Sequence, residues 1–209
     1  AESCKVIRKF SQAGKYHMDF DGENQDTICY GENMNFFVIS LADGVSDCSE
    51  SKCGAEIASK SIANLLLKKG DHFWQFEEEK IAELVLSHIL YELNERAMKD
   101  SKDINEYSST IACVLVDKNK DKMLSYSIGD SIILAIGNGR SRVLAMPSDS
   151  LSGCCVTTTR NVGMMTSIKI LDTVSIESIV ICSDGAWQQM YTKNSLKVEV
   201  AAMLANNEY

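Results

Sequence analysis

The sequence predicts an α+β fold in which helices pack outside antiparallel β-sheets. Short runs rich in Val, Ile, Phe and Tyr occur in the first third of the chain and again in its second half, separated by turn residues. Two longer stretches between them carry apolar residues at helical spacing. Strands, then two helices, then more strands is an order typical of antiparallel sheets covered by helices.

The first third of the chain contains three expected strands, which are Lys5–Phe10, Thr27–Gly31 and Phe36–Ala42. A first helix follows, in which apolar residues recur at helical spacing from Ala55 to Leu66, and Gly70 is expected to close it. A second helix is expected with Asp71 as its N-cap. Its apolar stripe consists of Ile81, Leu84, Val85, Ile89, Leu93 and Ala97.

The second half contains short apolar runs that are expected to pair as antiparallel hairpins. These runs are Ser109–Val116, Met123–Ile128, Ser131–Ile136, Ser141–Ala145, Ser167–Val174 and Ser178–Cys182. The Gly137–Arg140 segment is a hairpin turn, and the stretch from Pro147 to Thr166, rich in Ser, Thr and Gly, is expected to be loop. A helix from about Ser195 to Ala205 is expected to close the chain.

The chain has 209 residues and is expected to form one domain, over residues 1–209, with a substantial core. Its formal net charge is −8. This balance argues against a nucleic-acid binder, because a phosphate backbone is bound by an excess of Lys and Arg, and also against binding to anionic membranes. No segment has the apolar length needed to span a bilayer. We therefore expect neither a nucleic acid nor a membrane as partner.

The eight cysteines include no Cys-x-x-Cys pair. Cys29, Cys113 and Cys182 fall inside expected strands, where cysteine acts as a small apolar residue. Because a chain with this much core does not need a disulfide scaffold, we expect reduced thiols and a cytoplasmic protein. A zinc site with Cys48, Cys53 and a nearby histidine is the alternative, but this spacing fits no usual zinc site.

Three of the apolar runs end in an aspartate beside a glycine, and these aspartates are Asp43, Asp130 and Asp184. A carboxylate at the end of a buried strand, next to a flexible turn, is well placed to point into a shared cleft. Clustered carboxylates are hard oxygen ligands that suit Mg²⁺ or Mn²⁺. A single Asp-Gly is usually only a turn, and Asp21-Gly22 is read as one. The three strand ends together predict a metal-dependent hydrolase.

A fourth acidic motif, Asn24-Gln25-Asp26, precedes the strand at Thr27. Taken in order, Asn-Gln-Asp, Ala-Asp-Gly, Ser-x-Gly-Asp-Ser and Ser-Asp-Gly resemble the protein phosphatase 2C family of metal-dependent Ser/Thr protein phosphatases. The resemblance runs from about Gly14 to the C-terminus and is closest to the compact bacterial branch. Each motif alone is weak evidence for the family. The order of the four motifs, with two helices between the second and the third, makes the combination specific.

The resemblance implies two antiparallel β-sheets packed as a sandwich flanked by helices, with two Mg²⁺ or Mn²⁺ ions at one end. It implies that Asp43 bridges the ions, that Asp26 and the Gly44 carbonyl complete one site, and that Asp184 serves the other. Asp130 would lie near a third, weaker metal position. A hydroxide that bridges the metals would attack the phosphorus of phosphoserine or phosphothreonine, so no protein nucleophile is required.

The sequence departs from the family pattern in two places. Many members carry an arginine shortly before the Asn-Gln-Asp motif to grip the phosphate; here metals and waters, or His17, would replace it. Members usually carry a further aspartate ligand in a late strand, whereas this sequence ends at Asn206–Tyr209. A truncated domain that lacks its last strand is therefore one expectation.

Three readings of function follow from the sequence. The favoured one is a phosphatase that acts on phosphoproteins in a bacterial cytoplasm and opposes a Ser/Thr kinase. The alternative is a catalytically impaired phosphatase-like module with a binding or regulatory role, which the two departures support. A plain β-rich binding domain would require the order of the four carboxylate motifs to be accidental.

Overall fold

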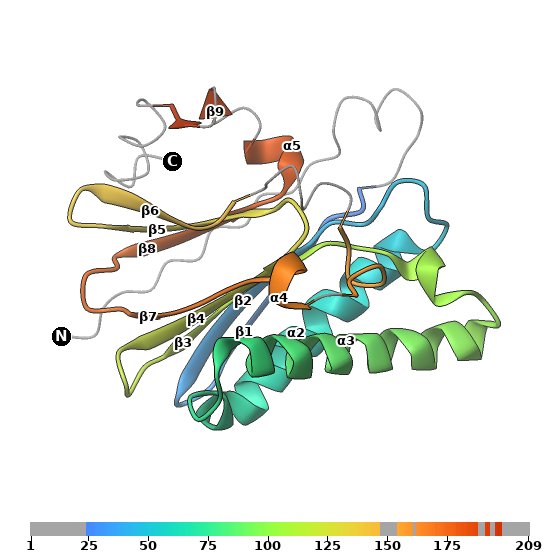
Figure 1. Ribbon diagram of the computed structural model, residues 1–209, viewed down its shortest axis with the longest axis horizontal. Helices are drawn as coiled ribbons and strands as arrows, with labels where there is room; N and C mark the ends of the chain where they lie inside the picture. Colours follow the sequence, from blue (N-terminus) through green and yellow to red (C-terminus); the bar gives the residue numbers. More distant parts are fainter. Residues whose placement is uncertain (1–23, 147–153, 161, 188–190, 193–194, 198–209) are drawn as a thin grey trace.

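A computed structural model describes residues 24–146, 154–160, 162–187, 191–192 and 195–197. In this part of the chain two antiparallel sheets lie face to face, and two long helices cover the outer face of the larger sheet (Figure 1). The expected strand Lys5–Phe10 and the candidate phosphate contact His17 lie outside the described residues.

The larger sheet has the order β1-β2-β3-β4-β7 and the smaller one β6-β5-β8, and all neighbouring strands are antiparallel. The strands are β1 (Thr27–Glu32), β2 (Phe36–Ala42), β3 (Ile111–Asp117), β4 (Lys122–Ile128), β5 (Ile132–Gly137), β6 (Arg140–Ala145), β7 (Ser167–Asp172) and β8 (Ser178–Cys182). The expected α+β class, the sandwich and these eight strands are confirmed, with ends shifted by up to two residues.

The larger sheet is buried on both faces. Ile111, Cys113 and Leu115 of β3 face the helices, whereas Ala112 and Val114 face the smaller sheet, because side chains alternate along a strand. Two hydrophobic cores therefore flank one sheet, which explains why its central strands are apolar at consecutive positions rather than at alternate ones.

The first long helix, α2 (Ser51–Phe73), runs past the expected stop at Gly70. Gly70 is buried inside the helix because the ring of Phe36 packs against it; a Cβ there would lie 2.8 Å from Phe36 Cζ. The glycine therefore provides room for packing, and it does not end the helix. Asp71 is a residue of α2 and not the N-cap of the next helix, so that prediction is also wrong.

The second long helix, α3 (Glu78–Asp100), has Glu77 at its N-cap position. Glu78 and Glu79 lie in its first turn, where acidic side chains favour the helix dipole. The predicted apolar stripe is buried except for Leu84, which is 37% exposed, because Ala82 and Leu86 face the core in its place.

The remaining elements are short. They are the 3-10 helix η1 (Ile104–Tyr107), α4 (Val162–Met165), α5 (Asp184–Trp187), β9 (Tyr191–Thr192) and β10 (Ser195–Leu196). The short helix α4 lies in the stretch that was expected to be loop, so that prediction is wrong over these four residues. The helix expected from Ser195 is wrong at its start, because Ser195 and Leu196 pair with β9 as a strand, and a tertiary pairing overrides a helical pattern. The segment from 198 to 209 lies outside the described residues, so the expectation of a domain that lacks its last strand stays a prediction.

Two further findings concern the cysteine thiols and the length of the helices. The seven cysteines in the described residues are all free. Within the same ranges, no helix is both long enough and apolar enough to cross a membrane.

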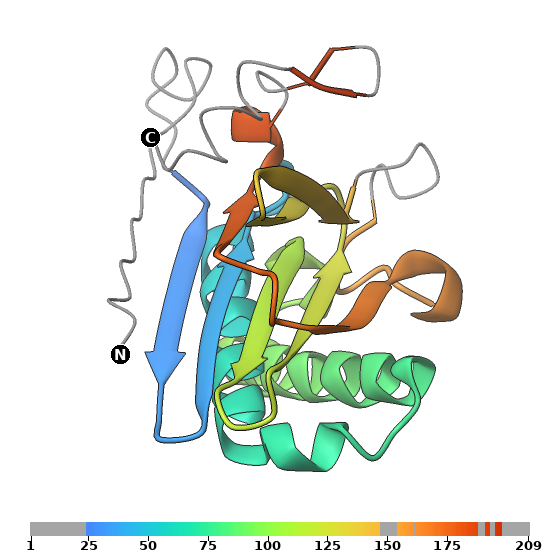
Figure 2. The ribbon, with the colours of Figure 1, turned by 90° about the vertical axis from the view of Figure 1, so that its left-hand side faces the viewer.

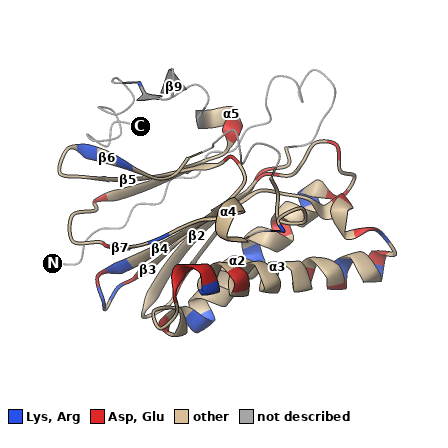
Figure 3. Cartoon of the chain, viewed as in Figure 1, with Lys and Arg blue, Asp and Glu red and all other residues tan. Residues whose placement is uncertain are grey.

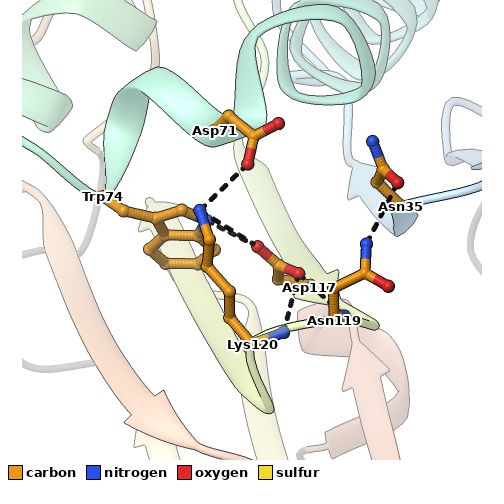
Figure 4. Close-up of polar contacts among 6 residues, drawn as sticks. All are labelled: Asn35, Asp71, Trp74, Asp117, Asn119 and Lys120. Atoms are coloured by element: carbon orange, nitrogen blue, oxygen red, sulfur yellow. Dashed lines mark hydrogen bonds and ion pairs between the residues drawn. The ribbon is translucent and has the colours of Figure 1, made fainter.

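A buried carboxylate ties the end of α2 to the turn between β3 and β4 (Figure 4). Asp117 is 2% exposed and accepts a hydrogen bond of 2.8 Å from the indole N–H of Trp74. The backbone N–H groups of Asn119 and Lys120 donate to its other oxygen over 2.9 and 3.1 Å. The Lys120 ammonium lies 3.0 Å from Asp71 on α2 and 3.9 Å from Asp117.

Replacing Asp117 by alanine is expected to lower the free energy of unfolding by about 2–3 kcal/mol, because three N–H donors lose their acceptor. Urea denaturation of the two proteins measures the effect. Asp71→Ala is the matched control, because it removes a carboxylate from an exposed ion pair and is expected to cost less than about 1 kcal/mol. Equal losses from both variants would contradict this assignment.

Candidate metal centre

The β1–β2 pairing brings Asp26 and Asp43 together. Thr27, the first residue of β1, lies opposite Ala42, the last residue of β2. Asp26 and Asp43 are the next residues beyond this pair, so they leave the sheet side by side. The two carboxyl groups are close enough for both the charge of Asp26 and a hydrogen bond to it to raise the pKa of Asp43.

The β5–β8 pairing brings Asp130 and Asp184 together in the same way. Ile132 lies opposite Cys182, and the two aspartates come just before β5 and just after β8. Burial raises the pKa of Asp130, the charge of Asp184 raises it further, and a backbone hydrogen bond lowers it. Asp130 and Asp184 are therefore electrostatic neighbours at the end of the smaller sheet.

The segment between β4 and β5 carries the chain from the larger sheet to the smaller one. Gly129 at the start of this crossing has φ +104°, a backbone conformation that favours glycine. A Cβ there would also lie 2.6 Å from the Thr110 methyl group. Gly129 thus lets the chain turn sharply after β4. Asp130 therefore comes only two residues after a strand of the larger sheet and yet lies at the end of the smaller sheet.

The two pairs of aspartates meet at one end of the sandwich, because the charges of Asp26, Asp130 and Asp184 all act on Asp43. Figure 2 shows the start of β1 (blue) and the end of β8 (orange) at the same end of the molecule. Ser183, the residue before Asp184, donates a hydrogen bond of 3.2 Å to Asp26 Oδ2 and so joins the two sheets. Asp26, Asp43, Asp130 and Asp184 are called the carboxylate cluster below, and this end of the sandwich the carboxylate end.

The electrostatics of the cluster centre on Asp43. Burial raises the pKa of Asp43, and the charges of Asp26 and Asp184, the hydrogen bond to Asp26 and the charge of Asp130 raise it further, to about 8. All three neighbouring groups that shift this pKa are carboxylates. The structure therefore brings together the four acidic residues that the sequence singled out.

The donor set fits a divalent cation. Carboxylate oxygens are the ligands that Mg²⁺ and Mn²⁺ prefer, and an acid whose pKa is raised by like charges gains most from a nearby cation. Among the described residues, however, no group of three or more His, Cys, Asp or Glu side chains is arranged to hold a metal ion, and this includes Cys48 and Cys53. The carboxylates are close enough to repel one another without forming a complete set of ligands.

The backbone around Asp43 and Gly44 is fixed by residues that the sequence analysis did not single out. The Asp43 N–H donates to Thr110 Oγ1 over 3.1 Å, and the Thr110 N–H donates to the Asp43 carbonyl over 2.8 Å. Gly44 forms an isolated bridge with Ser109. A Cβ at Gly44 would lie 2.9 Å from the Ser51 carbonyl group, so only glycine fits.

Asp26 and the loop after Gly44 are held in a similar way. Asn24 accepts a hydrogen bond of 3.0 Å from the Asp26 N–H through its side chain. The N–H of Val45 donates to the Ser108 carbonyl, and that of Ser49 to a carboxylate oxygen of Glu106, each over 3.0 Å. Asn24 and Ser183 belong to the quoted motifs, so their proximity to the cluster was visible in the sequence, whereas nothing in the sequence pointed to Thr110.

The raised pKa of Asp43 predicts how the stability of the metal-free protein depends on pH. Asp43 binds its proton more tightly in the folded state, with a pKa of about 8, than in the unfolded chain, where 3.8 is usual. Its contribution therefore favours folding fully below about pH 4 and is lost as the pH rises through 8. In EDTA, we expect Asp43→Asn to melt above the wild-type protein by about 5 °C at pH 8 and by much less at pH 5. Melting curves that stay parallel across this range would show that Asp43 is not the titrating group.

Comparisons with known proteins agree with this architecture. The sequence matches the protein-family model for protein phosphatase 2C over residues 13–208. A comparison with curated proteins found no match. Among solved structures, the Ser/Thr phosphatase Stp1 from Staphylococcus aureus is similar, with 13% identity, a TM-score of 0.63, and coverage of 95% of this chain and 86% of that one.

Two further structures have the same fold. A bacterial serine phosphatase has 14% identity and a TM-score of 0.60, with 95% and 88% of the two chains covered. A structure described under the bacterial stressosome has 14% identity and a TM-score of 0.53, with 90% and 85% covered. These likenesses bear on the fold, and the family match extends over nearly the whole sequence. The chain belongs to the protein phosphatase 2C family.

Proposed function

We propose that this protein phosphatase hydrolyses phosphoserine and phosphothreonine in proteins, and that it does so with two Mg²⁺ or Mn²⁺ ions held by the carboxylate cluster. The observation that carries the proposal is that the strand pairings and the Ser183–Asp26 hydrogen bond bring four carboxylates from both sheets to one end of the sandwich. The family match and the similar bacterial serine and Ser/Thr phosphatases support the substrate class.

In this proposal the residues of the cluster have different roles. Asp43 lies between the other carboxylates and would bridge the two metals, with Asp26 and the Gly44 carbonyl on one and Asp184 on the other. Asp130 would serve a third, weaker position. When bound, the metal pair supplies positive charge that offsets the phosphate dianion and activates a water as nucleophile.

The chain itself positions two of the carboxylates and sets the pH at which Asp43 loses its proton. Thr110 fixes the backbone of Asp43 from both sides, and Ser183 directs Asp26 toward the smaller sheet. Because Asp43 holds its proton up to a pKa of about 8 without a cation, metal binding would release that proton. Metal affinity is therefore expected to rise with pH.

The setting that we propose is a bacterial cytoplasm in which the enzyme opposes a Ser/Thr kinase. The free cysteines of the described residues fit a reducing compartment. The similar solved phosphatases come from bacteria, which supports the source.

Hydrolysis of p-nitrophenyl phosphate and of a phosphothreonine peptide tests the proposal. We expect no turnover in EDTA and turnover after addition of Mn²⁺ or Mg²⁺. Circular dichroism of the same samples shows whether the protein is folded. A folded protein that turns over neither substrate with either metal would overturn the proposal and favour a phosphatase-like binding module.

A further inference from the structure

A pocket of about 410 Å³ opens at the end of the sandwich opposite the carboxylate cluster. It lies between the β5–β6 hairpin and the connection from β7 to β8, which crosses between the sheets there (Figure 1). Its volume is within the range of roughly 300–1,000 Å³ that is usual for ligand pockets. The polar and charged residues of its lining are Asn138, Arg140, Ser141, Arg142, Asp172 and Ser175.

Contacts at two places hold the walls of the pocket. Near the carboxylate end, Ser167 of β7 donates a hydrogen bond of 3.3 Å to the Leu144 carbonyl of β6. At the other end, the β7–β8 connection rests directly on Gly137, where a Cβ would lie 1.7 Å from the Ser175 carbonyl oxygen. The N–H of Glu177 donates to the Ile136 carbonyl over 2.7 Å and fixes this wall.

Two arginines line this pocket from the edge strand β6. Arg142 lies opposite Ala135 of β5, which belongs to the core between the sheets, and Arg140 lies opposite Gly137, so both arginines are on the face of β6 that is turned toward the larger sheet. No hydrogen bond or ion pair of either guanidinium group occurs among the described residues. Figure 3 shows the basic residues on β6, near the β5–β6 turn.

The charge balance of the lining favours an anion. Two guanidinium groups and one carboxylate, that of Asp172, line the pocket, so positive charge is in excess within the lining. The Glu177 carboxylate lies beside it and accepts a hydrogen bond of 3.2 Å from the Asn138 N–H. The chain as a whole has a net charge of −8, which makes an uncompensated pair of arginines a distinct local feature. Arginine is suited to phosphate because its planar fork donates two parallel hydrogen bonds to two oxygens.

We propose that this pocket, here called the distal pocket, binds a second phosphoryl group of the phosphoprotein substrate through Arg140 and Arg142. This inference rests on the proposed function, since it assigns part of the substrate to a second place on the same enzyme. The pocket would thereby select substrates that carry clustered phosphorylation, or an acidic group in the equivalent position.

The fold sets the spacing between the two phosphates. Asp130 and the distal pocket lie at opposite ends of β5, whose six residues span roughly 20 Å at about 3.3 Å per residue. An extended peptide covers this distance in about six residues. A substrate with phosphates six or seven residues apart is therefore expected to reach both places.

Binding of fluorescent peptides to the 209-residue protein in EDTA tests the distal pocket without any turnover. One peptide carries phosphothreonine with phosphoserine seven residues away; the others carry serine or glutamate at the second position. We expect Arg140→Ala/Arg142→Ala to weaken binding of the first peptide about tenfold, measured by fluorescence anisotropy. Binding of the serine peptide should not change. Glutamate in place of the second phosphoserine shows whether a carboxylate also serves as the ligand.

Lys68→Ala/Lys69→Ala is the matched control, because it removes two positive charges from an exposed part of α2. Equal weakening by both double variants, or none by either, would overturn the proposal. An arginine variant that binds the peptide normally but forms dimers or larger assemblies would also overturn the proposal. The two arginines would then serve to keep the edge strand β6 from pairing with another chain, as inward-pointing charges on edge strands can do. Turnover of p-nitrophenyl phosphate by the arginine variant tests the proposed function separately, since this small substrate is too short to reach the distal pocket.

Discussion

Replacing Asp43 by alanine is expected to lower kcat/KM for p-nitrophenyl phosphate by roughly 10³-fold or more, because the proposed bridging carboxylate is lost and both metal positions are weakened. Asp43 is the residue whose pKa responds to all three other members of the cluster. A steady-state assay at saturating Mn²⁺ measures the loss. Asp184→Ala is expected to have a similar effect through one metal position.

Asp47→Ala provides the control for this prediction, because Asp47 is an exposed carboxylate four residues after Asp43. It is expected to retain wild-type turnover. The Asp43 variant should remain folded, since removing one of several repelling carboxylates does not remove a core contact. If Asp43→Ala and Asp184→Ala both kept wild-type turnover, the proposed metal centre would be wrong.

Gly54→Ala is expected to lower the free energy of unfolding by about 3 kcal/mol. Gly54 lies in α2 where the helix crosses η1, and a Cβ at this position would be 2.0 Å from the Tyr107 carbonyl oxygen. That oxygen belongs to the backbone, so it cannot move without displacing η1. Tyr107 is fully buried, and its hydroxyl donates to Asp100 at the end of α3 over 2.7 Å.

Gly70→Ala in the same helix is the informative comparison. Its Cβ would meet the ring of Phe36 at 2.8 Å, and a side chain can shift more easily than a backbone carbonyl. Alanine also favours a helix over glycine by about 1 kcal/mol. We expect a loss well below that of Gly54→Ala in urea denaturation. The reverse order of the two losses would show that η1 adjusts more readily than the Phe36 ring.

Local pattern predicted most of the secondary structure, because the large sheet is made of long apolar runs with clear turns between them. The hairpin at Gly137–Arg140 is an example, since Asn138 and Gly139 both have positive φ, as its turn chemistry requires. The family resemblance added the sandwich arrangement. The register, which places Thr27 opposite Ala42, came only from the structure.

The errors arose where a residue has a tertiary role that its type does not indicate. Gly70 is of the residue type that often ends a helix, but here the Phe36 ring requires a small residue at this position. Asp71 resembles an N-cap, yet its partner is Lys120 from a distant turn. The start of the expected helix at Ser195 pairs with β9, a contact that no local pattern contains.

For the candidate site, the sequence identified the four carboxylates, and the structure brings them together at the carboxylate end. Their roles as metal ligands stay predictions. The supporting contact from Thr110 could not be predicted, because it depends on the pairing of segments 67 residues apart. The distal pocket could not be predicted either, since its walls come from two sheets and its arginines look like ordinary surface residues of an edge strand.

During synthesis on a ribosome, Asp26, Asp43 and Asp130 leave the exit tunnel before Asp184. A nascent chain that has not yet released β8 can pair β1 with β2, but β5 still lacks the neighbour that brings Asp184 to Asp130. Under the proposed function, such a chain cannot remove phosphate from any protein. Activity would therefore begin only once β8, the last strand of the smaller sheet, has been made. Chains that are still shorter than this would not dephosphorylate other proteins.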